Sequence, residues 1–230
     1  NLGDLSRLVR ESGADIGMAV DPDVDRLALV DERGEPIGED YTLAFAVRAV
    51  LRGLKAGSGT PAVVVNLSTS LVVEDAAREH GARFFRAPVG EAHVARMIRD
   101  EGAVIGGEGN GGVILPSVHI GRDAPVGVAL ILQLLVESGQ TVSGLVAAAP
   151  RYHIVKAKAP RGADLAPAYQ ALRKRFADAT VDDRDGLRLS WPDRWVHLRA
   201  SGTEPVSRII AEAPTEADAQ RLAEQVRNAV

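Results

Sequence analysis

Cysteine is absent from the 230 residues of this chain. The absence excludes disulfide bonds, thiolate nucleophiles and cysteine-ligated zinc sites, and it mildly favours the cytoplasm. Long apolar runs are absent too, since no stretch approaches the roughly 18 residues that a membrane helix needs. The N-terminus also has no basic-then-apolar signal pattern. We therefore expect a cytoplasmic protein with no membrane partner.

Positive charge is in short supply, with 27 Lys and Arg against 31 Asp and Glu and a net charge of -4. The basic residues are scattered singly and form no stripe, which argues against a nucleic-acid partner. An apolar fraction of 46% and a mean hydropathy of -0.01 predict a soluble globular protein with one or two packed domains. The sequence leaves the oligomeric state open, with a homo-oligomer among the options.

Helix-type and strand-type patterns alternate over the first 150 residues. Such alternation implies right-handed crossovers and a mixed, mostly parallel α/β/α sandwich. The expected strands are 16–20, 27–30, 62–67, 82–86 and 104–107, and the expected helices are 2–9, 41–51, 72–79, 91–101 and 125–137.

The pattern changes after Pro150. Strands grouped with two helices predict a small antiparallel α+β domain, of the TATA-binding-protein-like kind, so that the fold class of the whole chain is α/β. Here the expected strands are 152–157, 187–190, 196–199 and 208–213, and the expected helices are 164–176 and 215–228.

The most informative segment is Asp-Pro-Asp-Val-Asp-Arg at 21–26, which we call the aspartate loop. Alternate side chains of an extended segment point the same way, so three carboxylates can converge on one hard cation such as Mg²⁺. A solvated turn between two strands is the simpler reading. A phosphatase of the haloacid dehalogenase type is another, but its motif wants Thr or Val at a position where Asp25 or Leu27 stands.

A glycine-rich segment at 106–112, the glycine loop, follows an expected strand. Open α/β sheets bind ligands at this edge, and glycines let the backbone approach a ligand closely. Glu108 can accept hydrogen bonds from two vicinal hydroxyl groups, and Asn110 can both donate and accept, which suits a sugar. A plain flexible loop is an equally good reading of this segment alone.

The third segment, Arg-Ala-Ser-Gly-Thr-Glu-Pro at 199–205, is called the arginine loop. Arg199 offers a bidentate fork, Ser201 and Thr203 offer hydroxyl donors, and Gly202 frees backbone N–H groups, so the turn can surround a phosphate. Arg208 could add charge from the next strand. A hairpin with an incidental arginine is the alternative.

Together the three segments resemble the motifs of the α-D-phosphohexomutase superfamily, which contains phosphoglucomutases, phosphomannomutases and phosphoglucosamine mutases. That family carries a D-G-D-x-D-R metal loop, a G-E-x-S-G-H or G-E-x-N-G-G sugar loop and an R-x-S-G/N-T-E-P phosphate loop. The matching segments here are 21–26, 107–112 and 199–205, in the family's order. Residues 87–90, Ala-Pro-Val-Gly, resemble its T-P-V-G segment.

The resemblance implies a reversible move of a phosphoryl group between the 1- and 6-positions of a hexose, through a phosphoserine and a bisphosphosugar. It implies Mg²⁺ as cofactor, bound by Asp21, Asp23 and Asp25, and a catalytic phosphate contact from Arg26. The implied substrate-binding residues are Gly90, Glu91, Glu108, Asn110, Gly111, Arg199, Ser201, Gly202, Thr203 and Arg208.

The sequence departs from the family pattern in several places. No segment matches the reactive-serine motif T/S-A-S-H-N-P, so the chain resembles a C-terminal fragment that lacks the phosphoserine domain. Its parts would be the end of domain II at 1–37, domain III at 38–150 and domain IV at 151–230. Pro22 stands for the usual glycine, Gly112 for the histidine of many members, and Glu91 where some members have Lys or His.

The form of the glycine loop favours phosphoglucosamine as the phosphorylated hexose substrate. Phosphomannomutase or phosphoglucomutase activity is the nearest alternative. A noncatalytic phosphosugar-binding remnant, which never had a first domain, is an alternative from a different functional class.

Replacing Arg199 by Ala should weaken phosphosugar binding much more than replacing Arg151 by Ala, because only Arg199 belongs to the phosphate-type motif. Titration of both variants with a hexose phosphate checks this expectation. Equal affinities in the two variants would contradict it.

Overall fold

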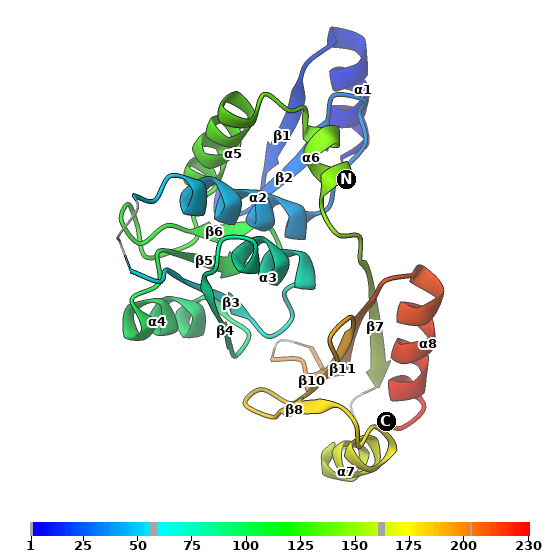
Figure 1. Cartoon of the computed structure of the whole chain (residues 1–230). Coiled ribbons are helices and arrows are strands. Elements are labelled where there is room, and N and C mark those ends of the chain that lie inside the picture. Colours follow the sequence, from blue (N-terminus) through cyan, green and yellow to red (C-terminus); the bar gives the residue numbers. More distant parts are fainter. Residues whose placement is uncertain (1, 56–58, 161–163, 203) are drawn as a thin grey trace. The chain divides into compact units, whose positions relative to one another are not determined.

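A computed structural model describes residues 2–55, 59–160, 164–202 and 204–230 of the chain (Figure 1). The chain divides into two compact units, Asn1–Pro150 and Arg151–Val230. Each unit has its own sheets, helices and buried core, and the two are described in turn.

The first unit opens with a helix and a β-hairpin. Helix α1 (Gly3–Ser12) precedes strands β1 (Ile16–Val20) and β2 (Leu27–Asp31), which pair antiparallel with Val20 opposite Leu27. The aspartate loop is therefore the connection of this hairpin. The hairpin ends at buried Asp31, whose carboxylate accepts hydrogen bonds from two backbone N–H groups of the following turn.

A separate four-stranded sheet forms the centre of the first unit. Its β-branched central strand, Ala-Val-Val-Val-Asn, is buried along its whole length, as expected for a strand covered on both faces. The first three strands are parallel and the last is antiparallel, in the order β4 (Arg83–Ala87), β3 (Ala62–Asn66), β5 (Ile105–Glu108) and β6 (Gly112–Ile114).

Helices cover both faces of this sheet. On one face, Val64 of β3 packs with Val94 and Ile98 of α4 in one buried cluster. Side chains alternate along a strand, so Val63 and Val65 face the other way, where α2 packs against both α3 and α5. The layering confirms the predicted α/β/α sandwich, and its helices are α2 (Glu39–Arg52), α3 (Leu71–Arg78), α4 (Glu91–Glu101) and α5 (Ala124–Ser138). Helix α6 (Val142–Ala148) packs on β2 of the hairpin.

The second unit is the predicted small antiparallel α+β domain. Val196, Leu198, Ile209 and Leu222 belong to one buried cluster between the sheet and its helices. The strands are ordered β7 (His153–Pro160), β11 (Val206–Ala213), β10 (Trp195–Ala200), β9 (Leu187–Ser190) and β8 (Thr180–Asp182), and the helices are α7 (Ala166–Arg175) and α8 (Glu216–Arg227).

Sequence patterns missed three short elements: β6, α6 and β8. Each has only three to seven residues, too few for a period to stand out. Strand β6 is held by its pairing with β5, and β8 by its pairing with β9. Helix α6 begins at a Thr141 cap and is tied to the hairpin by Glu32, which accepts hydrogen bonds from Ser143. Tertiary partners thus decide all three elements.

Within the described part of the chain, no individual helix has the length and hydropathy to cross a membrane. Helices α5 and α6 reach those values only when joined, across a bend of 81°.

Replacing Gly106 by Ala should destabilise the first unit by about 2 kcal/mol, a typical cost of overpacking a core. A Cβ atom there would lie 2.3 Å from the carbonyl oxygen of Val64 and 2.7 Å from Cδ1 of Ile98. Gly53 is the matched control, because the nearest neighbours of its Cβ would lie at 3.6 Å, an ordinary van der Waals distance. Urea unfolding of both variants measures the effect, and equal free energies of unfolding would refute it.

Candidate functional site

The aspartate loop is organised by the side chain of Asp21. Its Oδ1 accepts hydrogen bonds from the backbone N–H groups of Asp25 (3.1 Å) and Arg26 (3.2 Å), and its Oδ2 accepts from Nε of Arg26 (2.6 Å). Val24 adopts a left-handed conformation with φ 57°, which a β-branched residue rarely takes. The loop therefore keeps a strained backbone that the Asp21 carboxylate and the hairpin hold in place.

Two of the three loop carboxylates lie close together. Partial burial raises the pKa of Asp25, the positive charge of Arg122 opposes the rise, and the adjacent Asp21 adds to it. Burial also acts to raise the pKa of Asp21, but the hydrogen bonds from Arg26 and Asp25 outweigh it and lower the pKa to about 2. Asp23, in contrast, is exposed. Asp21 and Asp25 therefore form the converging pair.

The residues present fit a magnesium ion. Oδ1 of Asp25 is buried without a hydrogen-bond partner. The atoms available as metal ligands are carboxylate oxygens, which hard cations such as Mg²⁺ prefer. Magnesium in proteins is commonly held by one or two carboxylates and completes its shell with water and substrate oxygens. Across the described ranges, no three His, Cys, Asp or Glu side chains are grouped as a metal site, so the pair Asp21 and Asp25 would have to supply the protein ligands.

Glu108 of the glycine loop is buried, with 4% of its surface exposed. Its Oε1 accepts from Nδ2 of Asn66 (2.8 Å) and from the backbone N–H of Gly90 (3.1 Å). Its Oε2 accepts from Nη1 of Arg122 (2.8 Å). A carboxylate has about four acceptor positions, so these three bonds orient the group and leave capacity for a ligand hydroxyl.

Backbone hydrogen bonding joins the aspartate loop to the glycine loop. The N–H of Leu27 donates to the carbonyl oxygen of Gly111 (3.0 Å), and Gly111 has φ +86°. Oδ1 of Asn110 accepts from the N–H of Gly112 (3.2 Å), which fixes the turn between β5 and β6. Beside this junction is a cleft of about 340 Å³ whose wall includes Asp21, Arg26, Asn110 and Glu39.

Gly90 and Glu91 stand at the start of α4. Gly90 has φ +122° and directs its N–H toward Glu108, while Glu91 is the first helical residue. The carboxylate of Glu91 accepts from the backbone N–H of Arg122 (2.9 Å) and forms an ion pair with its Nε (3.3 Å). The first unit thus brings together all its predicted site residues except exposed Asp23.

Sequence patterns did not point to Arg122, Asn66 or Thr69. Arg122 contacts Asp25, Glu91 and Glu108, and the only sequence signal is its place just before the Asp123 helix cap. Asn66 ends the central strand, at the edge where ligand-binding residues collect. Thr69 follows it and accepts a hydrogen bond from the N–H of Gly109 (3.1 Å).

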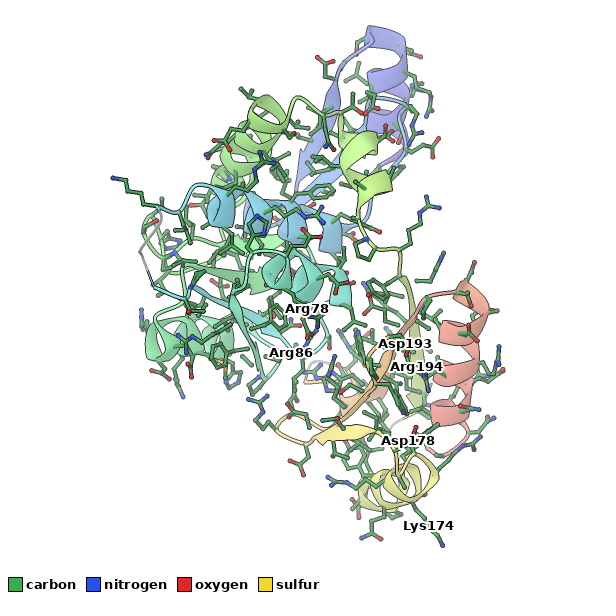
Figure 2. The ribbon with its side chains drawn as sticks, viewed as in Figure 1. Arg78, Arg86, Lys174, Asp178, Asp193 and Arg194 are labelled. Carbon is green, nitrogen blue, oxygen red and sulfur yellow. The ribbon has the colours of Figure 1, made fainter. Side chains whose placement is uncertain are left out.

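The turn after β3 is held by an arginine from the neighbouring strand. Nη1 of Arg86 donates to the carbonyl oxygen of Thr69 (2.8 Å), and its Nη2 pairs with Glu74 (3.0 Å). Arg78 of α3, labelled with Arg86 in Figure 2, also pairs with Glu74 (3.1 Å). These pairs brace the strand end that supplies Asn66.

The arginine loop lies in the second unit, between β10 and β11. Nε of Arg199 pairs with Oδ2 of Asp185 (3.2 Å). Ser201 is buried, and its Oγ accepts a hydrogen bond from the N–H of Glu204 (3.3 Å). Gly202 is exposed, and a Cβ atom at this position would have no heavy atom within 4 Å. Thr203 lies outside the described residues.

Three cations occupy neighbouring positions on one face of the second sheet. Arg199 is opposite Arg208, and Arg208 is opposite Lys158 on β7. Like charges at paired positions repel, and Glu204 compensates by pairing with both Lys158 (2.9 Å) and Arg208 (3.1 Å). Little in the sequence points to Lys158 as a member of this group. Lys158 lies two residues after Lys156, and both are among the chain's few lysines.

A cavity of about 390 Å³ in the second unit lies away from the arginine loop, and no described residue of that loop lines it. Several of its polar side chains are already paired. Nε1 of Trp191 donates to Asp178 (2.8 Å), and the guanidinium of Arg194 lies 4.7 Å from the centre of the Trp191 ring; Asp178 and Arg194 are labelled in Figure 2. We assign it no ligand.

Family models of phosphoglucomutase/phosphomannomutase match nearly the whole chain. Residues 1–34 match the alpha/beta/alpha domain II, residues 38–152 match domain III, and residues 154–229 match the C-terminal domain. The chain belongs to the phosphoglucomutase/phosphomannomutase family. The resemblance based on the three motifs is thereby confirmed.

Curated relatives carry two kinds of name. A probable phosphoglucosamine mutase of Methanopyrus kandleri is 40% identical over 228 residues, which cover 98% of this chain and 50% of the relative. A phosphoglucomutase/phosphomannomutase of Thermococcus kodakarensis is 37% identical over 228 residues, which cover 97% of this chain and 49% of the relative. The chain therefore spans about half the length of the curated relatives it matches.

Solved structures share the fold. A phosphoglucomutase/phosphomannomutase family protein from Burkholderia thailandensis has a TM-score of 0.83 at 25% identity, covering 100% of this chain and 49% of that one. An Aspergillus fumigatus N-acetylphosphoglucosamine mutase, in complex with GlcNAc-6P and magnesium, has a TM-score of 0.64 at 17% identity. The match covers 92% of this chain and 51% of that one. The second similarity concerns the fold alone.

His197, two residues before Arg199 on β10, should make the second unit acid-sensitive. Burial lowers its pKa to about 4, the bond to the Asp185 carbonyl opposes the shift, and Arg188 and Arg199 add to it. The unfolded chain thus binds more protons between pH 4 and 6.5, so stability present above pH 6.5 falls as the pH drops through this window, by about 3 kcal/mol.

His197→Gln keeps a donor for the Asp185 carbonyl but cannot titrate, so its stability should change less over the same window. Urea unfolding at several pH values measures the difference between wild type and variant. His153→Gln, at an exposed position of the same unit, is the control. A wild-type slope in the His197 variant would refute the assignment.

Proposed function

We propose that this chain supplies the metal-binding, sugar-binding and distal phosphate-binding parts of a phosphohexomutase that acts on glucosamine phosphate. The whole protein would move a phosphoryl group between the 6- and 1-positions of the sugar through a phosphoserine and a bisphosphosugar. The serine would come from a domain that the chain itself does not contain. The three parts would be residues 1–37, 38–150 and 151–230.

The aspartate loop would hold the reacting phosphoryl group. Asp21 and Asp25 present converging carboxylate oxygens to a magnesium ion, and exposed Asp23 adds negative charge to the same loop. Magnesium, when bound, neutralises the charge that develops on the transferred phosphoryl group. The Arg26 side chain, 46% exposed, can reach an oxygen of that group with its free guanidinium nitrogens.

The glycine loop would bind the sugar. Glu108 is oriented by three hydrogen bonds and can accept another from a sugar hydroxyl, and Asn110 faces the cleft beside Asp21 and Arg26. The backbone of Gly90 and Gly111 lets the ligand approach closely. Holding the sugar and its phosphate in one orientation is the main catalytic contribution expected of such residues.

The arginine loop would anchor the phosphate that is not reacting. Arg199, Ser201, Gly202 and Thr203 are the proposed contacts, with Arg208 from the next strand. The row of cations at Arg199, Arg208 and Lys158 supports this role, because a phosphate dianion can take over the ion pairs that Asp185 and Glu204 make.

The observation that carries the proposal is the junction of two loops that are about 80 residues apart in the sequence. The Leu27 to Gly111 hydrogen bond joins the two loops, and Arg122 pairs with both Asp25, proposed to bind the metal, and Glu108, proposed to bind the sugar.

Glucosamine is favoured by Glu91, whose partly exposed carboxylate beside Glu108 can pair with the 2-ammonium group of the sugar. Phosphates of uncharged hexoses, glucose and mannose, are the second candidate substrates, because one relative is named phosphoglucomutase/phosphomannomutase.

The purified 230-residue chain, supplied with Mg²⁺, should bind glucosamine 6-phosphate more tightly than mannose 6-phosphate but convert neither, because it has no reactive serine motif. Calorimetric titration measures the affinities, and phosphorus NMR detects any 1-phosphate product. Steady interconversion by this chain would contradict the proposal.

The coding sequence upstream of Asn1 separates the enzyme from the noncatalytic remnant. A Ser-His-Asn-Pro motif within a domain of roughly one to two hundred residues favours the enzyme. An upstream sequence without such a domain would rule out mutase turnover in the natural protein.

A further inference from the structure

Arg122 contacts three carboxylates from three separate segments. Its Nη2 lies 2.5 Å from Oδ2 of Asp25, its Nη1 lies 2.8 Å from Oε2 of Glu108, and its Nε lies 3.3 Å from Oε2 of Glu91. The side chain is 19% exposed. One planar guanidinium thus links the aspartate loop, the end of β5 and the start of α4, which a point-like ammonium cannot do with the same geometry.

The backbone on either side of Arg122 is fixed to the same segments. The N–H of Asp123 donates to the carbonyl oxygen of Val113 on β6 (2.9 Å). The N–H of Ala124 donates to the carbonyl oxygen of Val24, the residue with the left-handed backbone (3.2 Å). Asp123 caps α5 by accepting from Val126 (2.9 Å). The guanidinium therefore extends from an anchored base.

Gly112 leaves the room that Arg122 needs. A Cβ atom at Gly112 would lie 2.3 Å from Cδ of Arg122. Gly121 leaves room for the neighbouring side chains instead, because a Cβ atom there would lie 2.6 Å from Cε1 of His119 and 2.9 Å from Oε1 of Glu91. Position 112 of the glycine loop thus has no space for a side chain while Arg122 is in place. The glycine loop and Arg122 are complementary in size as well as in charge.

Arg48 shows what a purely structural arginine looks like in the same unit. Its side chain is 11% exposed and forms a bidentate pair with Glu79 at 3.0 and 2.7 Å. Glu79 belongs to none of the proposed binding segments. The partners of Arg122, in contrast, are the carboxylates proposed to hold the metal and the sugar, which would repel one another without a cation between them.

We propose that Arg122 is a positioning residue that sets the separation of Asp25 from Glu108 and Glu91, so that metal and sugar are bound in register. The inference rests on the proposed function. It makes binding at the aspartate loop and binding at the glycine loop interdependent, a coupling that an arginine needed only for folding would not create.

The test measures the affinity of the 230-residue chain for glucosamine 6-phosphate with and without Mg²⁺. In the wild type, Mg²⁺ should increase this affinity at least fivefold. Arg122→Met should abolish the increase, and Arg122→Lys should restore part of it, because an ammonium can pair with some of the three carboxylates. Arg48→Met, the matched control, should keep the full increase.

Each result has one meaning. The positioning role is overturned, and the proposed function stands, if a folded Arg122→Met protein shows the same Mg²⁺-dependent increase in affinity as the wild type. The same conclusion follows if the wild type itself binds the sugar phosphate equally well with and without Mg²⁺. A wild type that binds no hexose phosphate overturns both. Should Arg122→Met fail to fold, by circular dichroism, full coupling in Arg122→Lys would overturn the role and a partial loss would support it.

Discussion

The first unit depends on compensating the negative charge that is gathered around Arg122. Glu108 is almost fully buried, Asp25 and Glu91 lie near it, and Arg122 is the cation between them. Burying an unpaired carboxylate costs several kcal/mol, and removing one partner of a buried pair typically costs 3–5 kcal/mol. The arrangement of the loops around this arginine therefore follows from the need to keep each carboxylate paired.

Backbone constraints act on the same loops. Asp21 uses its carboxylate to satisfy the N–H groups of Asp25 and Arg26, which holds Val24 in a left-handed conformation. The carbonyl oxygen of Val24 then accepts from the first residue of α5. A strained residue of this kind persists only where its surroundings determine it. Contacts within the protein itself thus define the loop geometry.

The second unit solves the opposite problem, because it gathers positive charge. Lys158, Arg208 and Arg199 are neighbours across three strands, and Glu204 and Asp185 pair with them. The two-fold pairing lowers the pKa of Glu204. The pairs of Glu204 are exposed and therefore weak, so a dianion of higher charge can replace this carboxylate at small cost. The same physical rule, charge compensation, shapes both candidate sites.

The sequence by itself determined the elements whose hydrophobic period is long enough to read, the boundary near Pro150 and the three loops, because periodicity and turn residues are local signals. The short elements β6, α6 and β8 were not readable, since pairing and packing with distant residues hold them. Only the tertiary structure decided that Asp21 and Asp25 converge while Asp23 is exposed, and that Arg122, Asn66 and Lys158 join the predicted residues. A side chain's partners depend on which strand ends and loops meet in space, and no spacing along the chain encodes that meeting.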